Sequence, residues 1–323
     1  MWCDVGIGKA EKMSTIKPVG LHHVTAIATD PARNVEFYTR VLGLRLVKQT
    51  VNFDDPGSYH LYYGDEQGAP STLLTFFPWP DVPVGRSGPG LATVTAFAVP
   101  GNSLGFWDSR LTELGIGHER PRTVGDEEVL RLRDHDGIVI DLVATDGDAR
   151  SGWDGVGGIS TEHAVRGLHS ITLSETDLDA TAEMLTDLMS MSTAEETTES
   201  ARFVMTPGEV ASVVNLVTDS QDRGVQAGGT VHHVAFRAPD ETTLSQWHDQ
   251  LRDAGKHVTE ILDRQYFKSI YFREPGGVLF EIATDTPGFD VDEPLLELGR
   301  HLKLPPWLEP NRTQIEANLP PLK

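Results

Sequence analysis

The chain has 323 residues, 48 acidic and 27 basic side chains, a formal charge of -21 and one cysteine. This length predicts two domains of about 150 residues, each large enough to bury its own core. One cysteine excludes an internal disulfide and a metal site built from several thiolates. The negative charge makes nucleic acid and membrane surfaces poor partners, and the sequence has no apolar run of the roughly 20 residues that a membrane helix needs and no signal-peptide core. We therefore expect a cytoplasmic protein.

Residues 1–16 carry no repeat pattern, and we expect them to form a disordered N-terminal extension, or translation to start at Met13. The rest of the chain, up to about residue 288, contains four copies of one unit. Each copy opens with a similar strand, and these strands begin at Leu21, Leu91, Leu168 and Val231. Similar strands at regular spacing predict one structural module repeated four times.

In each copy a polar turn and an amphipathic helix follow the first strand. In the first copy, Asp30 and Pro31 mark the start of the helix and Gly43 its end. Short β-rich runs come next, and the last strands are expected over 72–77, 138–143, 212–217 and 278–282. The module therefore reads as βαβββ.

One helix and four short strands cannot enclose a core, so the modules must pair. The predicted fold is α+β, with four βαβββ modules paired into two domains that have cup-shaped sheets. We expect residues 17–148 to form the first pair and 160–288 the second, divided by a Gly/Asp-rich stretch. The apolar tail 289–323 is expected to pack on the body or over the mouth of the site, and a contact with a second copy in a homo-oligomer is the alternative.

Equivalent positions in the four modules differ in their capacity to bind metal. The first strands carry His23, Thr93, Ser170 and His233 at one position, and the last strands carry Thr75, Asp141, Asn215 and Glu281 at another. The first and fourth modules thus supply two histidines and a carboxylate, the triad that binds non-haem Fe(II) and leaves positions open. The same ligands suit Mn(II) or Zn(II). Satisfied core histidines are the alternative, but a buried Glu281 would be costly without a cation or a hydrogen-bond partner.

The neighbouring histidines, His22 and His232, should point away from His23 and His233 unless the strands are bulged. Structural packing and a supporting or acid–base role are both open for them.

The three most distinctive stretches, 20–25, 229–236 and 263–281, resemble the vicinal oxygen chelate superfamily, which includes glyoxalases, bleomycin-resistance proteins and extradiol dioxygenases. The similarity is greatest to its hydroquinone-type ring-cleaving dioxygenases. The resemblance implies that Fe(II) is bound by His23, His233 and Glu281. It also implies supporting or substrate-facing roles, and so catalytic contributions, for five further residues: His22, Thr25, His232, Arg264 and Tyr271.

The resemblance implies an Fe(II)-dependent extradiol-type dioxygenase that takes a small aromatic phenol and O2. Arg264 would stabilise developing negative charge, and Tyr271, His22 or His232 would relay protons. Without the resemblance, Arg264 would read as a surface ion pair with Asp263 or Glu260, and Tyr271 as sheet core. A glyoxalase-like isomerase or lyase and a protein that sequesters small aromatic molecules are the rival functions, although Thr75 stands where the isomerases carry a second carboxylate.

Overall fold

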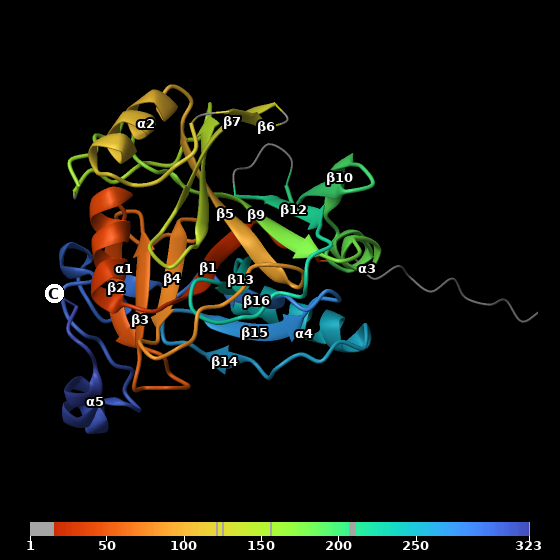
Figure 1. The fold of residues 1–323 in the computed structure, drawn as a ribbon. Coiled ribbons are helices and arrows are strands. Elements are labelled where there is room, and N and C mark those ends of the chain that lie inside the picture. The colour runs from red at the N-terminus through yellow and green to blue at the C-terminus, as the bar shows by residue number, and fades with distance from the viewer. Residues whose placement is uncertain (1–15, 121, 125, 156, 207–210, 323) are drawn as a thin grey trace, which may run out of the picture.

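The computed structural model describes residues 16–120, 122–124, 126–155, 157–206 and 211–322 (Figure 1). Strands dominate it. The first two modules contain β1 (Leu21–Ala28), β2 (Arg45–Val51), β3 (Tyr59–Gly64), β4 (Leu73–Pro78), β5 (Leu91–Pro100), β6 (Arg122–Val124), β7 (Glu127–Arg133) and β8 (Val139–Thr145). The last two contain β9 (Gly167–Glu175), β10 (Ser192–Glu196), β11 (Ser200–Val204), β12 (Val213–Thr218), β13 (Val231–Ala238), β14 (Leu262–Asp263), β15 (Lys268–Arg273) and β16 (Leu279–Thr284).

Each module has one main helix. These are α1 (Pro31–Glu36), which continues as a π-helical turn over Phe37–Val41, α2 (Leu104–Glu113), α3 (Asp179–Glu183), which continues over Met184–Leu188, and α4 (Glu241–Asp253). The tail holds short 3₁₀ turns at Phe289–Val291, Leu295–Glu297 and Glu309–Asn311, and then α5 (Arg312–Asn318). Among the described residues, no helix is long and apolar enough to cross a membrane.

Two eight-stranded sheets contain the sixteen strands of the described residues, in the orders β14-β15-β16-β13-β1-β4-β3-β2 and β10-β11-β12-β9-β5-β8-β7-β6. The predicted α+β fold of four βαβββ modules is therefore confirmed. The two sheets do not follow the expected pairs, residues 17–148 and 160–288. The first module shares a sheet with the fourth, and the second shares one with the third, because β1 pairs with β13 and β5 with β9.

The helices cover the sheets with the apolar stripes that their sequences predict. In α4, Leu244, Trp247 and Leu251 are fully buried at spacings of three and four residues, and the helix packs against β13, β15 and β16. Asp240 caps this helix, since its side chain accepts a hydrogen bond of 2.7 Å from the Thr243 backbone N–H. The helices thus bury one face of each sheet and leave the other face for a cavity.

The tail that follows β16 runs back over β2, where Leu304 and Ile315 are buried against Val51. In Figure 1 its α5 lies beside the lower ends of β2 and β3. At the other end of the chain, the extension expected over residues 1–16 lies outside the described residues except for Ile16. The Ile16 N–H donates to Gln250 Oε1 over 3.3 Å, and its side chain packs on the main core.

Candidate metal centre and substrate pocket

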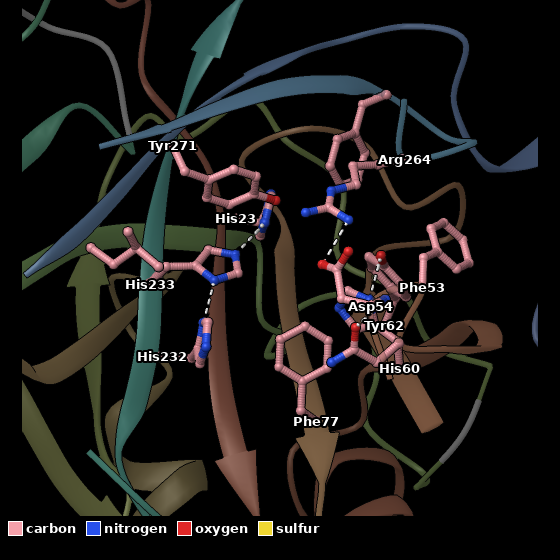
Figure 2. A pocket seen from close by; sticks show the side chains of 13 residues that line it. His23, Phe53, Asp54, His60, Tyr62, Phe77, His232, His233, Arg264 and Tyr271 are labelled. Carbon is pink, nitrogen blue, oxygen red and sulfur yellow. Dashed lines mark hydrogen bonds and ion pairs between the residues drawn. The ribbon is translucent and has the colours of Figure 1, made fainter. Parts of the chain in front are cut away.

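Three neighbouring strands bring the predicted metal ligands together. Ala235 in β13 pairs with His23 in β1 on one side and with Glu281 in β16 on the other, so these positions face the same side of the sheet. His233 stands two residues before Ala235 and therefore shares that face. Figure 2 shows His23 and His233 pointing into the same cavity.

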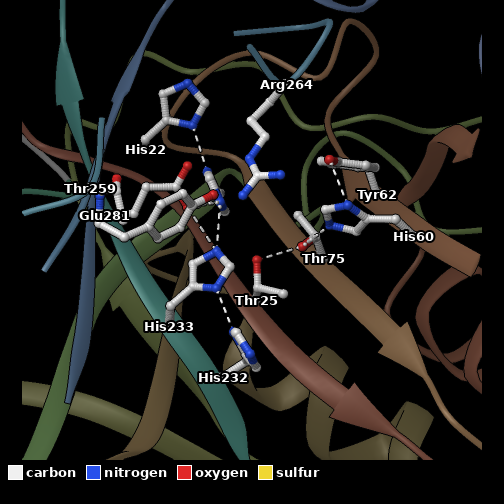
Figure 3. Close-up of polar contacts among 12 residues, drawn as sticks. His22, Thr25, His60, Tyr62, Thr75, His232, His233, Thr259, Arg264 and Glu281 are labelled. Atoms are coloured by element: carbon white, nitrogen blue, oxygen red, sulfur yellow. Dashed lines mark hydrogen bonds and ion pairs between the residues drawn. The ribbon is translucent and has the colours of Figure 1, made fainter. Parts of the chain in front are cut away.

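The three side chains converge on one point, and Figure 3 shows two of them, His233 and Glu281. Glu281 Oε2 lies 3.2 Å from His23 Nε2 and 2.9 Å from His233 Nε2, and the two Nε2 atoms are 3.2 Å apart. Three adjacent ligands of an octahedral ion, each about 2.1 Å from it, would stand roughly 3.0 Å apart. The ligand set therefore fits a divalent cation bound on one face, and the three residues form a group able to hold a metal ion.

The environment of the Glu281 carboxylate favours a bound cation. The side chain is fully buried, and neither carboxylate oxygen accepts a well-oriented hydrogen bond from the described residues. Burial opposes the ionised form, but the two imidazoles outweigh it and hold the pKa of Glu281 well below its usual range. A buried anion with free lone pairs is stable only when a positive charge shares its site.

Two β-bulges place the neighbouring histidines against the ligands. In the register between β1 and β13, His22 and His232 are the extra residues at the two shifts. Each then reaches its neighbour: His22 Nδ1 is 2.8 Å from His23 Nδ1, and His232 Nδ1 is 2.8 Å from His233 Nδ1. From the sequence we expected His22 and His232 to point away from the ligands unless the strands were bulged, and the structure shows both bulges.

His22 determines which nitrogen of His23 is free. The His22 Nε2–H donates to the Thr284 carbonyl oxygen over 3.1 Å, because a carbonyl can only accept. Burial and the nearby His23 lower the pKa of His22 to about 3, so the ring is neutral and its Nδ1 is an acceptor. His23 must then donate through Nδ1–H, which leaves the lone pair of its Nε2 pointing at the metal position.

The pocket in front of the metal position has a volume of about 280 Å³. His232, Arg264 and Tyr271 line it, whereas His22 lies behind the ligands and faces a different hollow. Thr25 is fully buried and does not line the pocket; its hydroxyl shares a hydrogen bond of 2.7 Å with the Thr75 hydroxyl.

Arg264 and Tyr271 form one side of the pocket (Figure 2). The guanidinium carbon lies 5.2 Å from the centre of the Tyr271 ring, and Arg264 Nη1 donates to Asp54 Oδ2 over 3.0 Å. The ion pair expected with Asp263 or Glu260 is therefore replaced by one across the mouth of the pocket. Although burial opposes its charge, Tyr271 and Asp54 raise the pKa of Arg264, whereas burial and Glu281 raise that of Tyr271. The first stays cationic and the second stays a phenol at neutral pH.

The sequence reasoning missed a hydrogen-bonded chain along the opposite wall. Tyr62 Oη is 2.8 Å from His60 Nδ1, and His60 Nε2 is 2.9 Å from the hydroxyl of Thr75. Burial, followed by the nearby His23 and His233, lowers the pKa of His60 well below its usual value. The available signal was the two-residue spacing of His60 and Tyr62, which puts both on one face of β3.

The equivalent cup of the second sheet is closed by ion pairs. Arg131 donates two hydrogen bonds of 2.7 Å to Asp141, the residue equivalent to Glu281. Arg202 and His169 both approach Glu127, at 2.7 and 3.3 Å. The cationic positions are thus filled by arginine, and the second cup carries no equivalent of the His/His/Glu group among the described residues.

A second group of His and Asp residues consists of Asp134, His135 and Asp136. Its Asp134 accepts hydrogen bonds within a turn and so has a structural role. Asp134 accepts hydrogen bonds from the Tyr38 hydroxyl and from the backbone of Asp136 and Ile138, and Asp136 accepts from Thr29. The carboxylates of Asp134 and Asp136 thus already accept hydrogen bonds from protein donors.

A known superfamily shares this fold. The family model of the Glyoxalase/Bleomycin resistance protein/Dioxygenase superfamily matches residues 20–142 and 167–282, so the chain belongs to that superfamily. A Bacillus subtilis protein named "Putative ring-cleaving dioxygenase MhqE" is 43% identical, over 95% of this chain and 100% of its own length. The "Chlorohydroquinone/hydroquinone 1,2-dioxygenase" of Sphingobium indicum is 31% identical, over 90% of this chain and 92% of its own.

A solved structure agrees with this assignment. The crystal structure of a "putative dioxygenase from Bacillus subtilis subsp. subtilis str. 168" superimposes with a TM-score of 0.91 at 40% identity, covering 95% of this chain and 98% of that one. The glyoxalase I of Zea mays, at 15% identity and a TM-score of 0.62, shares the fold. The resemblance found in the sequence is therefore confirmed.

Proposed function

We propose that the protein is an Fe(II)-dependent extradiol-type dioxygenase that cleaves the ring of a hydroquinone or a related phenol with O2. The observation that carries the proposal is the His23, His233 and Glu281 group at the floor of an aromatic-lined pocket. The relatives named as ring-cleaving and hydroquinone dioxygenases support it. Mn(II) is the second metal that this ligand set suits.

The pocket has the size and lining for one substituted ring. A cavity of about 150 Å³ is enough to hold benzene, and the volume here is about 280 Å³. Phe77 and Phe267 supply apolar walls, and the His60 ring stands 4.4 Å from that of Phe77. An aromatic ring can therefore lie flat in the pocket with a hydroxyl group directed at the metal position.

When bound, Fe(II) supplies the redox chemistry that allows O2 to react with an electron-rich ring. Arg264 offers a fixed positive charge beside negative charge that develops on the substrate, and its buried Nε has no hydrogen-bond partner among the described residues. Tyr271, kept protonated, acts as a hydrogen-bond donor to the same region.

His232 is placed to donate a hydrogen bond to the substrate. Burial and the nearby His233 lower its pKa to about 3, so the ring is neutral. If its Nδ1 accepts from His233, as His22 does from His23, its proton resides on Nε2. Because His232 lines the pocket, that N–H is available to donate a hydrogen bond to the substrate.

The experiment is anaerobic reconstitution with Fe(II), followed by measurement of O2 uptake with a panel of hydroquinones and catechols. We expect one O2 consumed per ring cleaved. An iron-loaded protein that consumes no O2 across the panel would contradict the proposal and favour the isomerase chemistry of the superfamily. Asp141→Asn, at the equivalent position of the closed cup, is the matched control for Glu281→Gln and should keep the activity.

A further inference from the structure

A fully buried lysine joins the C-terminal tail to the first module. Lys48 of β2 donates from Nζ to the Phe289 carbonyl at 3.0 Å, to Asp292 Oδ1 at 2.6 Å and to Glu293 Oε2 at 2.6 Å. A buried ammonium group is stable only when such partners replace its water. The tail segment 289–293 is therefore tied to β2 by charge as well as by apolar packing.

The same ion group reaches the fourth module through Tyr266. The Tyr266 hydroxyl donates to Asp292 Oδ2 over 3.0 Å, and Lys48 Nζ lies 4.9 Å from the centre of its ring. Tyr266 is almost fully buried and packs on Phe289, with ring centres 5.0 Å apart. Asp292 thus bonds with one oxygen to the lysine and with the other to the tyrosine.

Tyr266 belongs to a strained turn that delivers pocket residues. In the turn 263–267 between β14 and β15, Gln265 has a φ of 66°, a left-handed conformation unusual for a side chain other than glycine. The Gln265 N–H donates to Asp263 Oδ1 over 2.7 Å, and the Arg264 N–H donates to the Phe267 carbonyl over 2.9 Å. Such a conformation persists where the surroundings hold it in place.

Both ends of this turn face the proposed metal. Arg264 lines the pocket, and the Phe267 ring packs on the rings of His22 and His23, with centres 5.3 Å away in each case. A shift of the turn would therefore move the pocket cation and an apolar wall together.

We propose that the tail segment 289–293 is a clamp that acts through Asp292 and Tyr266 to fix the turn 263–267. By holding the turn it positions Arg264 against the substrate, although none of the described tail residues lines the pocket. Asp292 and Tyr266 are thus positioning residues for the pocket. The catalytic consequence rests on the proposed function, whereas the effect on the turn does not.

The test measures hydrogen exchange in peptides that cover residues 263–267, in the full-length chain. In Asp292→Ala and Tyr266→Phe we expect these amides to exchange about fivefold faster or more, the effect of losing one hydrogen bond. Asp292→Asn keeps a hydrogen bond to the Tyr266 hydroxyl and should restore most of the protection. The milder Tyr266→Phe keeps the ring, so it tests the clamp even if Asp292→Ala fails to fold.

Arg45→Met is the matched control. Arg45 also holds the tail, with hydrogen bonds of 2.7 and 3.4 Å from Nη2 to the carbonyls of Leu295 and Leu298. Its Nη1 donates to the Glu66 carbonyl, so none of these hydrogen bonds goes to the turn. This variant should loosen the tail but leave exchange in the turn unchanged. Unchanged exchange in both Asp292→Ala and Tyr266→Phe, or an equal rise in Arg45→Met, would overturn the clamp.

The catalytic arm uses the iron-loaded variants with unsubstituted hydroquinone. We expect kcat/KM to fall about fivefold in Asp292→Ala and Tyr266→Phe at unchanged iron content, and to stay within about twofold of wild type in Arg45→Met. Faster exchange with unchanged kcat/KM would overturn the positioning role. If the wild type does not turn over any phenol, the proposed function fails, while the exchange data still decide whether the clamp exists.

Discussion

Replacing Glu281 with glutamine should separate metal binding from folding. The substitution keeps the size of the side chain but removes the only negative charge among the three ligands, which stand 2.9 to 3.2 Å apart. A metal that binds only the folded state, at 100 times its Kd, stabilises the protein by about 2.7 kcal/mol. We expect that gain to fall below about 0.1 kcal/mol if Glu281→Gln weakens binding by about a thousandfold.

The assay is thermal unfolding at pH 8 under anaerobic conditions, with and without Fe(II) or Mn(II). In the wild type the metal should raise the Tm by about 3–6 °C, and in Glu281→Gln the Tm should not respond. Asp141→Asn should keep the full response. A wild-type response in Glu281→Gln, or its loss in Asp141→Asn, would refute the ligand assignment.

Three further predictions follow from other parts of the structure. His22→Phe removes the acceptor of the His23 Nδ1–H and should weaken metal binding by about 10- to 100-fold in an equilibrium titration, and wild-type affinity would contradict the deduced tautomer. Arg264→Lys keeps the charge but loses the guanidinium geometry, so kcat/KM for hydroquinone should fall at least about tenfold at unchanged iron content, and full activity would exclude Arg264 from the site. Burial and the nearby Glu274 raise the pKa of Glu175 to about 8, so the folded state binds this proton more tightly than the unfolded state does. That stabilisation, on the order of a few kcal/mol, is complete below the unfolded pKa and is lost as the pH rises towards 8; urea unfolding from pH 5 to 9 should show it in the wild type and less of it in Glu175→Gln.

The internal repeat allowed the fold and the candidate metal ligands to be predicted from the sequence. Four copies of one strand pattern identify the module. Comparing equivalent positions singles out His23, His233 and Glu281, because the second and third modules offer a much poorer set of ligands for a divalent transition metal. Such patterns lie in short stretches of the chain, so they can be recognised from the sequence before the fold is known.

Other features of the site depend on contacts between distant segments. The opposite wall with His60, the bulges that turn His22 and His232 towards the ligands, and the partner of Arg264 all arise from strand register or from loops that meet across the pocket. No local pattern encodes them, because a one-residue change of register moves every side chain to the other face.

The sequence by itself determined the module, its fourfold repetition and the class of fold, and it singled out the three candidate ligands. Only the tertiary structure decided that the first module pairs with the fourth and the second with the third, that the second cup is closed by ion pairs, and that Lys48 ties the tail to the turn of Arg264. The physical reason is that strand pairing and buried ion pairs are chosen by the free energy of the whole packed molecule, in which segments more than 200 residues apart become neighbours.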